Sequence, residues 1–166
     1  MMKFLYATAA VAALTLASTP ALAVPATQNA KATARIIKPL TLTSRRNLDL
    51  GSITLVGSGS TTVSIARDGT VTCPAGNVTC AGPTSSAEYR VTGVNNQTVS
   101  ITVGDVELTN LADGSKMMLD VDAPATLNLG NSGTAGTDFQ IGGAITVSGL
   151  TTEGTYEGFF DVSVNY

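Results

Sequence analysis

Histidine and tryptophan are absent from this 166-residue chain, and aromatic residues make up only 5% of it. Without histidine there is no Ser-His-Asp triad, no Cys-His pair and no histidine-based metal site. No glycine-rich phosphate loop of standard spacing occurs either. The scarcity of aromatic rings also argues against a sugar-cleaving cleft, because such clefts are usually lined with rings that stack on the sugar. We therefore expect a protein that is not an enzyme and that has no cofactor, metal site or small-molecule substrate.

Long runs of basic residues are also missing. The chain has 9 basic and 12 acidic residues, and the only adjacent basic pair is Arg45-Arg46. A protein that tracks a phosphate backbone or adsorbs to anionic lipid needs a larger basic surface. From this composition we expect neither nucleic-acid binding nor adsorption to anionic lipid.

Carboxylates are the remaining candidates for acid–base or metal chemistry. Asp120 and Asp122 are two residues apart on an expected strand, so their side chains point the same way. Glu153 and Glu157 flank the last turn of the chain. One region gathers Asp105, Glu107, Asp113, Asp120 and Asp122, but this spacing matches no EF-hand. We expect all of these acids to be solvated surface residues.

The first residues have the three-part pattern of a secretory signal peptide. Lys3 provides the positive charge, an apolar stretch follows, and Ala21-Leu22-Ala23 places small residues where a signal peptidase cleaves. The stretch is too short for a transmembrane anchor. We expect residues 1–23 to be removed, leaving residues 24–166 as a single exported domain in the periplasm, at the cell surface or outside the cell.

Only two cysteines occur, Cys73 and Cys80, separated by turn-forming residues that include Pro74, Gly76 and Asn77. In an oxidising compartment, an even pair this close is most simply one disulfide. We expect the Cys73–Cys80 bridge to close a hairpin tip or a surface loop.

The rest of the chain alternates short β-rich runs with Gly, Asn, Asp, Pro and Ser, and it shows no helical periodicity after the signal peptide. This pattern is typical of an all-β immunoglobulin-like β-sandwich of roughly 7–10 strands, with a small β-barrel as the alternative. Hairpins are expected at Asp68-Gly69 and Asn95-Asn96. The expected strands are Ala32–Thr43, Leu48–Val56, Thr61–Ala66, Thr70–Cys73, Glu88–Val94, Gln97–Val103, Met117–Val121, Ala125–Leu129, Phe139–Val147 and Tyr156–Tyr166.

The last of these strands has the most regular alternation in the chain. One face carries Tyr156, Gly158, Phe160, Val162, Val164 and Tyr166. The other face carries Glu157, Asp161, Ser163 and Asn165, with Phe159 as the exception. The pattern alone is compatible with an ordinary core strand or with a strand used in assembly.

Three segments together resemble the family known as domain of unknown function 4402, which contains exported proteins of Gram-negative bacteria. They are residues 32–53, with Leu48-Asp49-Leu50-Gly51-Ser52-Ile53, then Phe139–Val147, and finally Gly154–Gly158 with the Val162, Val164 and Tyr166 ending. The resemblance covers nearly all of residues 24–166 and implies no established function.

The chain is more distantly similar to chaperone–usher pilins and spore-coat-U-like proteins. The resemblance rests on the spacing from Gly154 to Tyr166, with alternating apolar residues between them. It implies an incomplete sandwich, a periplasmic chaperone as partner, and self-association in which the N-terminal extension of one subunit enters its neighbour. Here that extension, residues 24–34, alternates and is rich in alanine. The chain is therefore expected to be a pilin-like subunit of a surface fibre or coat.

Two alternatives use the same sequence features. A self-sufficient sandwich would act as a monomeric surface or binding module. An outer-membrane β-barrel would also end in an alternating strand with a terminal aromatic, as Phe160, Val162, Val164 and Tyr166 do, but most runs here are short and aromatics are scarce.

Overall fold

The computed structural model describes residues 26–131 and 135–166. The chain divides into two units, Met1–Arg35 and Ile36–Tyr166. In the first unit the described residues, 26–35, form no strand and are exposed. The predicted signal peptide, residues 1–23, lies outside the described residues. Among the described residues there is no helix long and apolar enough to cross a membrane.

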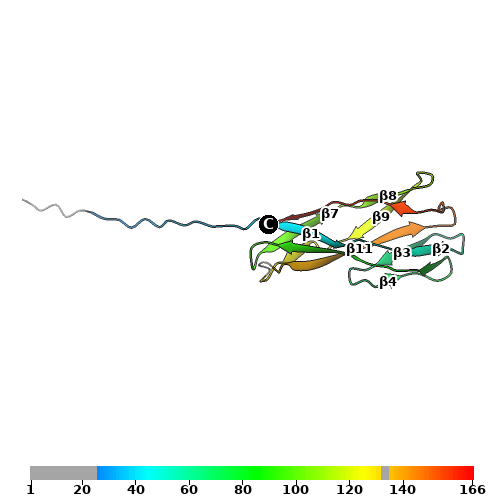
Figure 1. Cartoon of the computed structure of the whole chain (residues 1–166), viewed down its shortest axis with the longest axis horizontal. Helices are drawn as coiled ribbons and strands as arrows, with labels where there is room; N and C mark the ends of the chain where they lie inside the picture. Colours follow the sequence, from blue (N-terminus) through cyan, green and yellow to red (C-terminus); the bar gives the residue numbers. More distant parts are fainter. Residues whose placement is uncertain (1–25, 132–134) are drawn as a thin grey trace, which may run out of the picture. The chain divides into compact units, whose positions relative to one another are not determined.

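The second unit is built from thirteen short β-strands, with no helix among its described residues (Figure 1). The strands are β1 (Thr41–Arg46), β2 (Ser52–Leu55), β3 (Thr61–Ile65), β4 (Val71–Thr72), β5 (Val78–Ala81), β6 (Ala87–Thr92), β7 (Thr98–Val103), β8 (Val106–Asn110), β9 (Lys116–Asp122), β10 (Thr126–Asn128), β11 (Thr137–Val147), β12 (Tyr156–Glu157) and β13 (Val162–Asn165).

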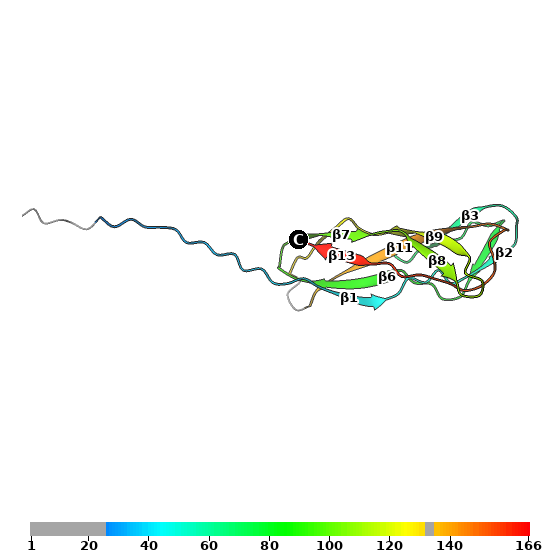
Figure 2. The ribbon, with the colours of Figure 1, turned by 90° about the horizontal axis from the view of Figure 1, so that it is seen from above.

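The strands form an eight-stranded sheet, a three-stranded sheet and a two-stranded sheet, and all pairs are antiparallel. The eight-stranded sheet follows the order β1-β6-β11-β9-β8-β12, with β3 and β4 attached through β11. The three-stranded sheet has the order β10-β7-β13 and lies over the first (Figure 2). The architecture is an all-β sandwich of curled sheets, which confirms the fold class predicted from the sequence.

Two long segments pass from one sheet to the other. β7 lies in the three-stranded sheet, but after Gly104-Asp105 the chain continues as β8 in the eight-stranded sheet. The β12–β13 segment makes the same switch in reverse, because β12 pairs with β8 and β13 pairs with β7. These switches curl the sheets around a shared interior.

The interior contains two adjoining apolar clusters. The first consists of Ala87, Val91, Val99, Ile101, Leu129, Phe139 and Ile141. The second consists of Val63, Val78, Leu108, Leu119, Ile145 and Val147. Phe160, Leu48 and Val121 pack against both clusters and so join them. The alternation predicted for Gln97–Val103 is confirmed, since Val99 and Ile101 are buried while Thr98, Ser100 and Thr102 are exposed.

Several predicted strand details were wrong. The first strand begins at Thr41 and not at Ala32, because the residues before it have no strand to pair with. The Asn95-Asn96 turn is not a hairpin, since β6 and β7 belong to different sheets. The strands β5 and β8 were not predicted, and the expected strand Tyr156–Tyr166 is two strands, β12 and β13. The described residues therefore form thirteen strands where roughly 7–10 were expected.

Candidate functional site

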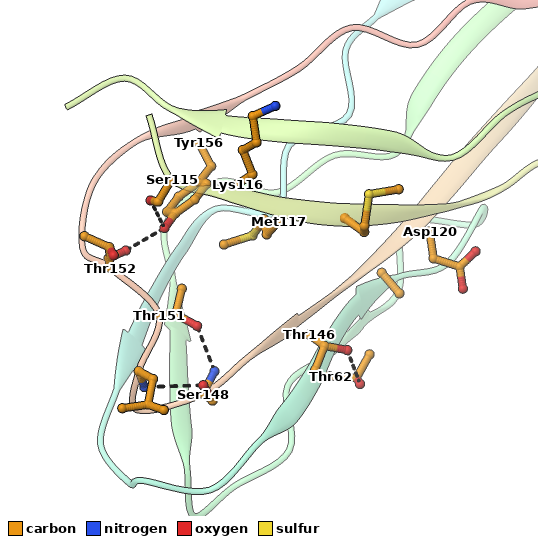
Figure 3. Close-up of a pocket in the computed structure, with 13 residues that line it drawn as sticks. Thr62, Ser115, Lys116, Met117, Asp120, Thr146, Ser148, Thr151, Thr152 and Tyr156 are labelled. Atoms are coloured by element: carbon orange, nitrogen blue, oxygen red, sulfur yellow. Dashed lines mark hydrogen bonds between the residues drawn. The ribbon is translucent and has the colours of Figure 1, made fainter. Parts of the chain in front are cut away.

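An open pocket of about 580 Å³ lies on the outer face of β3, β9 and β11, near the loop between β11 and β12 (Figure 3). Its residues come from four strands and two loops, so no single sequence segment defines it. The lining consists of Thr62, Ser115, Lys116, Met117, Met118, Asp120, Ala144, Thr146, Ser148, Leu150, Thr151, Thr152 and Tyr156. Two of its apolar members are strongly exposed, Met118 at 58% and Leu150 at 94%.

Most polar groups of this pocket already have partners within the chain. The Thr62 and Thr146 hydroxyls are 3.0 Å apart across the β3–β11 pair. The Tyr156 hydroxyl donates to the carbonyl oxygen of Thr152 at 2.9 Å and lies 3.0 Å from the Ser115 hydroxyl. These bonds hold the pocket wall together, and they leave few groups directed at a ligand.

The pocket does not assemble catalytic groups. Asp120 is its one carboxylate, and no group of three potential metal ligands occurs among the described residues. The prediction that Asp120 and Asp122 share a face of β9 is confirmed, since both are exposed around the buried or half-buried Leu119 and Val121. Asp122 pairs with Arg67 at 3.1 Å on the surface.

Three of the other predicted surface acids, Asp105, Glu107 and Asp113, have structural partners. Glu107 forms an ion pair with Lys116 at 2.5 Å. Asp105 accepts a hydrogen bond from the backbone N–H of Val121 at 3.1 Å. Asp113 accepts one from the N–H of Ser115, and this bond lowers the pKa of the Asp113 carboxyl. These contacts stabilise turns and strand ends.

A second candidate site is the open side of the sandwich, which we define as the side bounded by the edge strands β1 and β13. β1 is the first strand of the eight-stranded sheet and has only β6 as a neighbour. Leu42 lies directly opposite Val91, so both side chains point inward. Val91 is fully buried, yet Leu42 remains 36% exposed. An inward-pointing leucine with that exposure shows that the core is incompletely covered at β1.

The β13 edge shows the same incomplete cover. Val162 lies opposite Val103 and Val164 opposite Ile101, so both point into the core. Ile101 is buried at 7% exposure, whereas Val162 and Val164 are only half-buried. Since β13 pairs with β7 alone, its other edge has no strand partner among the described residues.

The two edges meet at one end of the body. The Tyr166 hydroxyl, just after β13, donates to the carbonyl oxygen of Lys38, just before β1, at 2.7 Å. β1 runs away from this contact while β13 runs toward it, so the two edge strands run in opposite directions along the open side (Figure 2). β13 contributes the half-buried Val162 and Val164 to the first apolar cluster, and Leu40, just before β1, packs against the same cluster.

The predicted assembly strand, Gly154–Tyr166, is not one continuous strand. It forms β12 and β13, separated by residues 158–161, because it follows the switch of β8 and β7 between sheets. Tyr156, Phe160, Val162 and Val164 point inward as predicted. Gly154 has a φ of +144°, and a Cβ there would come within 2.4 Å of the Asn110 side chain, so a side chain at this position would be strained.

The Cys73–Cys80 disulfide is present, with the Cα atoms 6.2 Å apart. It spans a surface loop between β4 and β5, as predicted. β4 pairs with β3 and β5 pairs with β2, so the bridge ties together two strands that have different partners. No free cysteine occurs among the described residues.

Sequence reasoning missed the pocket and the exposure of Leu42. The lining of the pocket depends on strand order, which no local pattern shows. The alternation in the expected strand Ala32–Thr43 puts Leu42 on its apolar face, and Pro39 indicates an edge position or a bulge. The pairing of β1 with β6 alone shows that the strand is an edge.

These features define a disulfide-linked β-sandwich with an open side and no assembled catalytic centre among its described residues. A comparison with protein families matches residues 40–166 to the family described as Domain of unknown function (DUF4402), and the chain belongs to that family. The match covers the strands and leaves residues 26–39 outside it. No curated protein and no solved structure matches the chain.

Proposed function

We propose that this protein is an exported, non-enzymatic structural subunit that assembles into a surface fibre or coat by receiving an extended strand along its open side. The observation that carries this proposal is the half-exposed state of Leu42, Val162 and Val164, which point into the core from two unpartnered edges. A strand placed between the edges would add backbone hydrogen bonds and remove apolar surface from water, at about 25 cal/mol per Å².

The proposed compartment is the periplasm, the cell surface or the medium. The Cys73–Cys80 bridge supports it, because disulfides persist mainly in oxidising environments. The pattern of Lys3 and Ala21-Leu22-Ala23 supports export independently. A periplasmic chaperone that covers the open side before assembly fits the same scheme.

Deletion of residues 24–32 tests the proposal. The chain beginning at Val24 should form concentration-dependent oligomers and fibres visible by electron microscopy, and the shortened chain should stay folded but monomeric. A matched control replaces residues 24–32 one for one with glycine and serine, which keeps the length and removes the alternation. If the chain beginning at Val24 is a cooperatively unfolding monomer at every concentration and no fibre appears, the proposal fails.

A second candidate function is a self-sufficient monomeric surface or binding module. The hydroxyl-lined pocket with the exposed Met118 and Leu150 favours it. This function requires a stable monomer. Measuring whether the chain beginning at Val24 forms concentration-dependent oligomers therefore distinguishes the two candidates. Ala144→Arg would then fill the pocket and should abolish adhesion of the protein to its target surface, with Thr102→Arg on the opposite sheet as the control.

A further inference from the structure

The pocket on the outer face of β3, β9 and β11 plays no part in the proposed assembly, since none of its described lining residues belongs to β1 or β13. β11 is the central strand there, and its Ala144 lies opposite Ser64 of β3 and opposite Asp120 of β9. Because the methyl group of Ala144 is short, the sheet surface is depressed between the two flanking strands. A smaller pocket of about 230 Å³ shares Asp120 and Ala144 with the first, so the two form one depression.

We propose that this depression binds a short oligosaccharide that carries no negative charge. The inference goes beyond the proposed assembly and requires no exchange of strands. It gives a ligand class to the pocket on which the second candidate function rests.

Hydroxyl groups along the depression keep protons available for a ligand. The Thr151 hydroxyl accepts a hydrogen bond from the backbone N–H of Ser148 at 3.0 Å, and the Ser148 hydroxyl accepts one from the N–H of Leu150 at 3.3 Å. Neither hydroxyl donates its own proton within the described part of the chain. The hydroxyls of Thr62 and Thr146 bond to each other, which uses one of their two protons and leaves the second free.

Asp120 presents the opposite chemistry at the other end of the depression (Figure 3). Its carboxylate is exposed and makes no hydrogen bond or ion pair within the described part of the chain. An ionised carboxylate can only accept, so it requires a donor from the ligand. Ser148 follows Ala144, the cross-strand neighbour of Asp120, by four residues, a distance of about 13 Å along an extended chain.

A sugar hydroxyl suits both ends of this depression, because it can donate to a carboxylate and accept from a serine or threonine. The separation of the two ends exceeds the length of one sugar ring, which favours an oligosaccharide. The exposed side chains of Met118 and Leu150, at 58% and 94%, border the pocket and can cover the C–H face of the rings. Aliphatic groups hold sugar rings less strongly than aromatic rings do, so we expect weak, millimolar binding.

The charges around the depression disfavour an anionic sugar. Lys116 is the one cation among the described residues that line the larger pocket, and it is paired with Glu107. The smaller pocket adds Asp122, whose charge is balanced by Arg67. Asp120 is left without a counterion, and a carboxylate on the ligand would be repelled by it. The ligand is therefore neutral or cationic.

Saturation-transfer difference NMR of the chain beginning at Val24 tests this assignment. The neutral probes are maltotriose, cellotriose and mannotriose, and the anionic probe is trigalacturonate. At least one neutral trisaccharide should receive saturation, and trigalacturonate should receive none. Asp120→Ala should weaken the binding at least about tenfold, because it removes a charged acceptor, while Asp161→Ala, outside the pocket, should leave the affinity unchanged.

The paired hydroxyls provide a second variant that keeps the fold. Thr62→Val with Thr146→Val removes both hydroxyls, keeps the branched shape of both side chains and leaves no polar group unpaired. This variant should bind about threefold to tenfold more weakly. The matched control is Thr41→Val with Thr92→Val, which removes an equivalent hydroxyl pair across β1 and β6 and should bind like the unmodified chain. Thermal unfolding verifies that each variant is folded.

Three results would each overturn this inference: no neutral trisaccharide receives saturation, trigalacturonate binds as well as they do, or the pocket and control variants bind equally. Saturation of tetraserine without any sugar binding would also overturn it, by assigning the depression to an extended peptide. The method observes the signals of the sugar, so it works on a monomer and on a fibre alike. Failure of sugar binding and failure of assembly are therefore measured separately.

Discussion

The hydroxyl of Tyr166 donates a hydrogen bond to the carbonyl oxygen of Lys38 across the end of the sandwich, at 2.7 Å. The same hydroxyl accepts a hydrogen bond from the backbone N–H of Val94 at 2.9 Å. One side chain therefore links the segment that leads into β1, the turn after β6 and the end of β13. Because these elements belong to both sheets, this contact closes one end of the body.

Tyr166→Phe should lower the free energy of unfolding by about 1 kcal/mol, since it removes two hydrogen bonds and keeps the ring. Urea denaturation of the purified protein measures the change. Phe159→Leu is the control, because Phe159 is 93% exposed and its replacement should alter stability little. Equal effects of the two substitutions would show that the Tyr166 hydroxyl contributes nothing.

Gly93 makes room for this contact. A Cβ at position 93 would come within 2.8 Å of the Tyr166 hydroxyl and of the Leu40 side chain. Gly93→Ala should cost about 1–3 kcal/mol through overpacking, and less when Tyr166 is already phenylalanine. A double-mutant cycle measures the coupling, and strictly additive effects would contradict the proposed contact.

Asn110→Ala should destabilise the protein by about 1–3 kcal/mol, because it leaves two partly buried backbone groups without a partner. The Asn110 side chain is 1% exposed, donates to the carbonyl oxygen of Glu153 at 3.0 Å and accepts from the N–H of Ala112 at 2.9 Å. Asn128→Ala is the matched control, since Asn128 is exposed and its side chain accepts one hydrogen bond among the described residues, from the N–H of Gly130. Thermal unfolding should show a clear loss for the first variant alone.

Cys73→Ser with Cys80→Ser should lower stability by about 2 kcal/mol, since the bridge closes a short loop and restricts the unfolded chain only modestly. Denaturant unfolding of the variant and of the unmodified protein, with and without reductant, measures the loss. Reductant should affect only the unmodified protein. A loss much larger than this would mean that the bridge is needed to hold β4 and β5 in place.

Asp138 should make part of the stability depend on acid pH. Its carboxylate accepts hydrogen bonds from the Arg90 guanidinium at 2.6 and 2.5 Å, and these bonds hold the pKa of Asp138 below its usual value. A carboxyl whose pKa is lowered by folding stabilises the protein above its unfolded pKa, near 4, and this contribution is lost as the pH falls through the lower folded value.

Asp138→Asn should therefore reduce the slope of stability against pH below about pH 4, as measured by urea unfolding at several pH values. The effect should be small and should shrink in salt, because the pair is more than a third exposed. Asp161→Asn serves as the control at a carboxylate that forms no ion pair in the described part of the chain. An unchanged slope in Asp138→Asn would show that the Arg90 contact does not matter in solution.

The strand-rich class, the Cys73–Cys80 bridge and most strand positions followed from the sequence alone. These properties depend on neighbours along the chain: the alternation of Val99 and Ile101 with threonine and serine, the Asp68-Gly69 turn, and two cysteines a short loop apart. Local patterns report such properties because side-chain direction and turn geometry are set within a few residues.

Only the tertiary structure decided which strands are edges. The alternation in Thr41–Ser44 and in Val162–Asn165 is the same as in any strand with one buried face. It does not show that Leu42 and Val164 lie on edge strands, where no further strand covers the core. The sheet switch that divides Gly154–Tyr166 into β12 and β13 is equally invisible in the sequence. Edges and switches depend on pairing between residues far apart in the chain, and an alternating pattern is the same whether one neighbour or two complete the sheet.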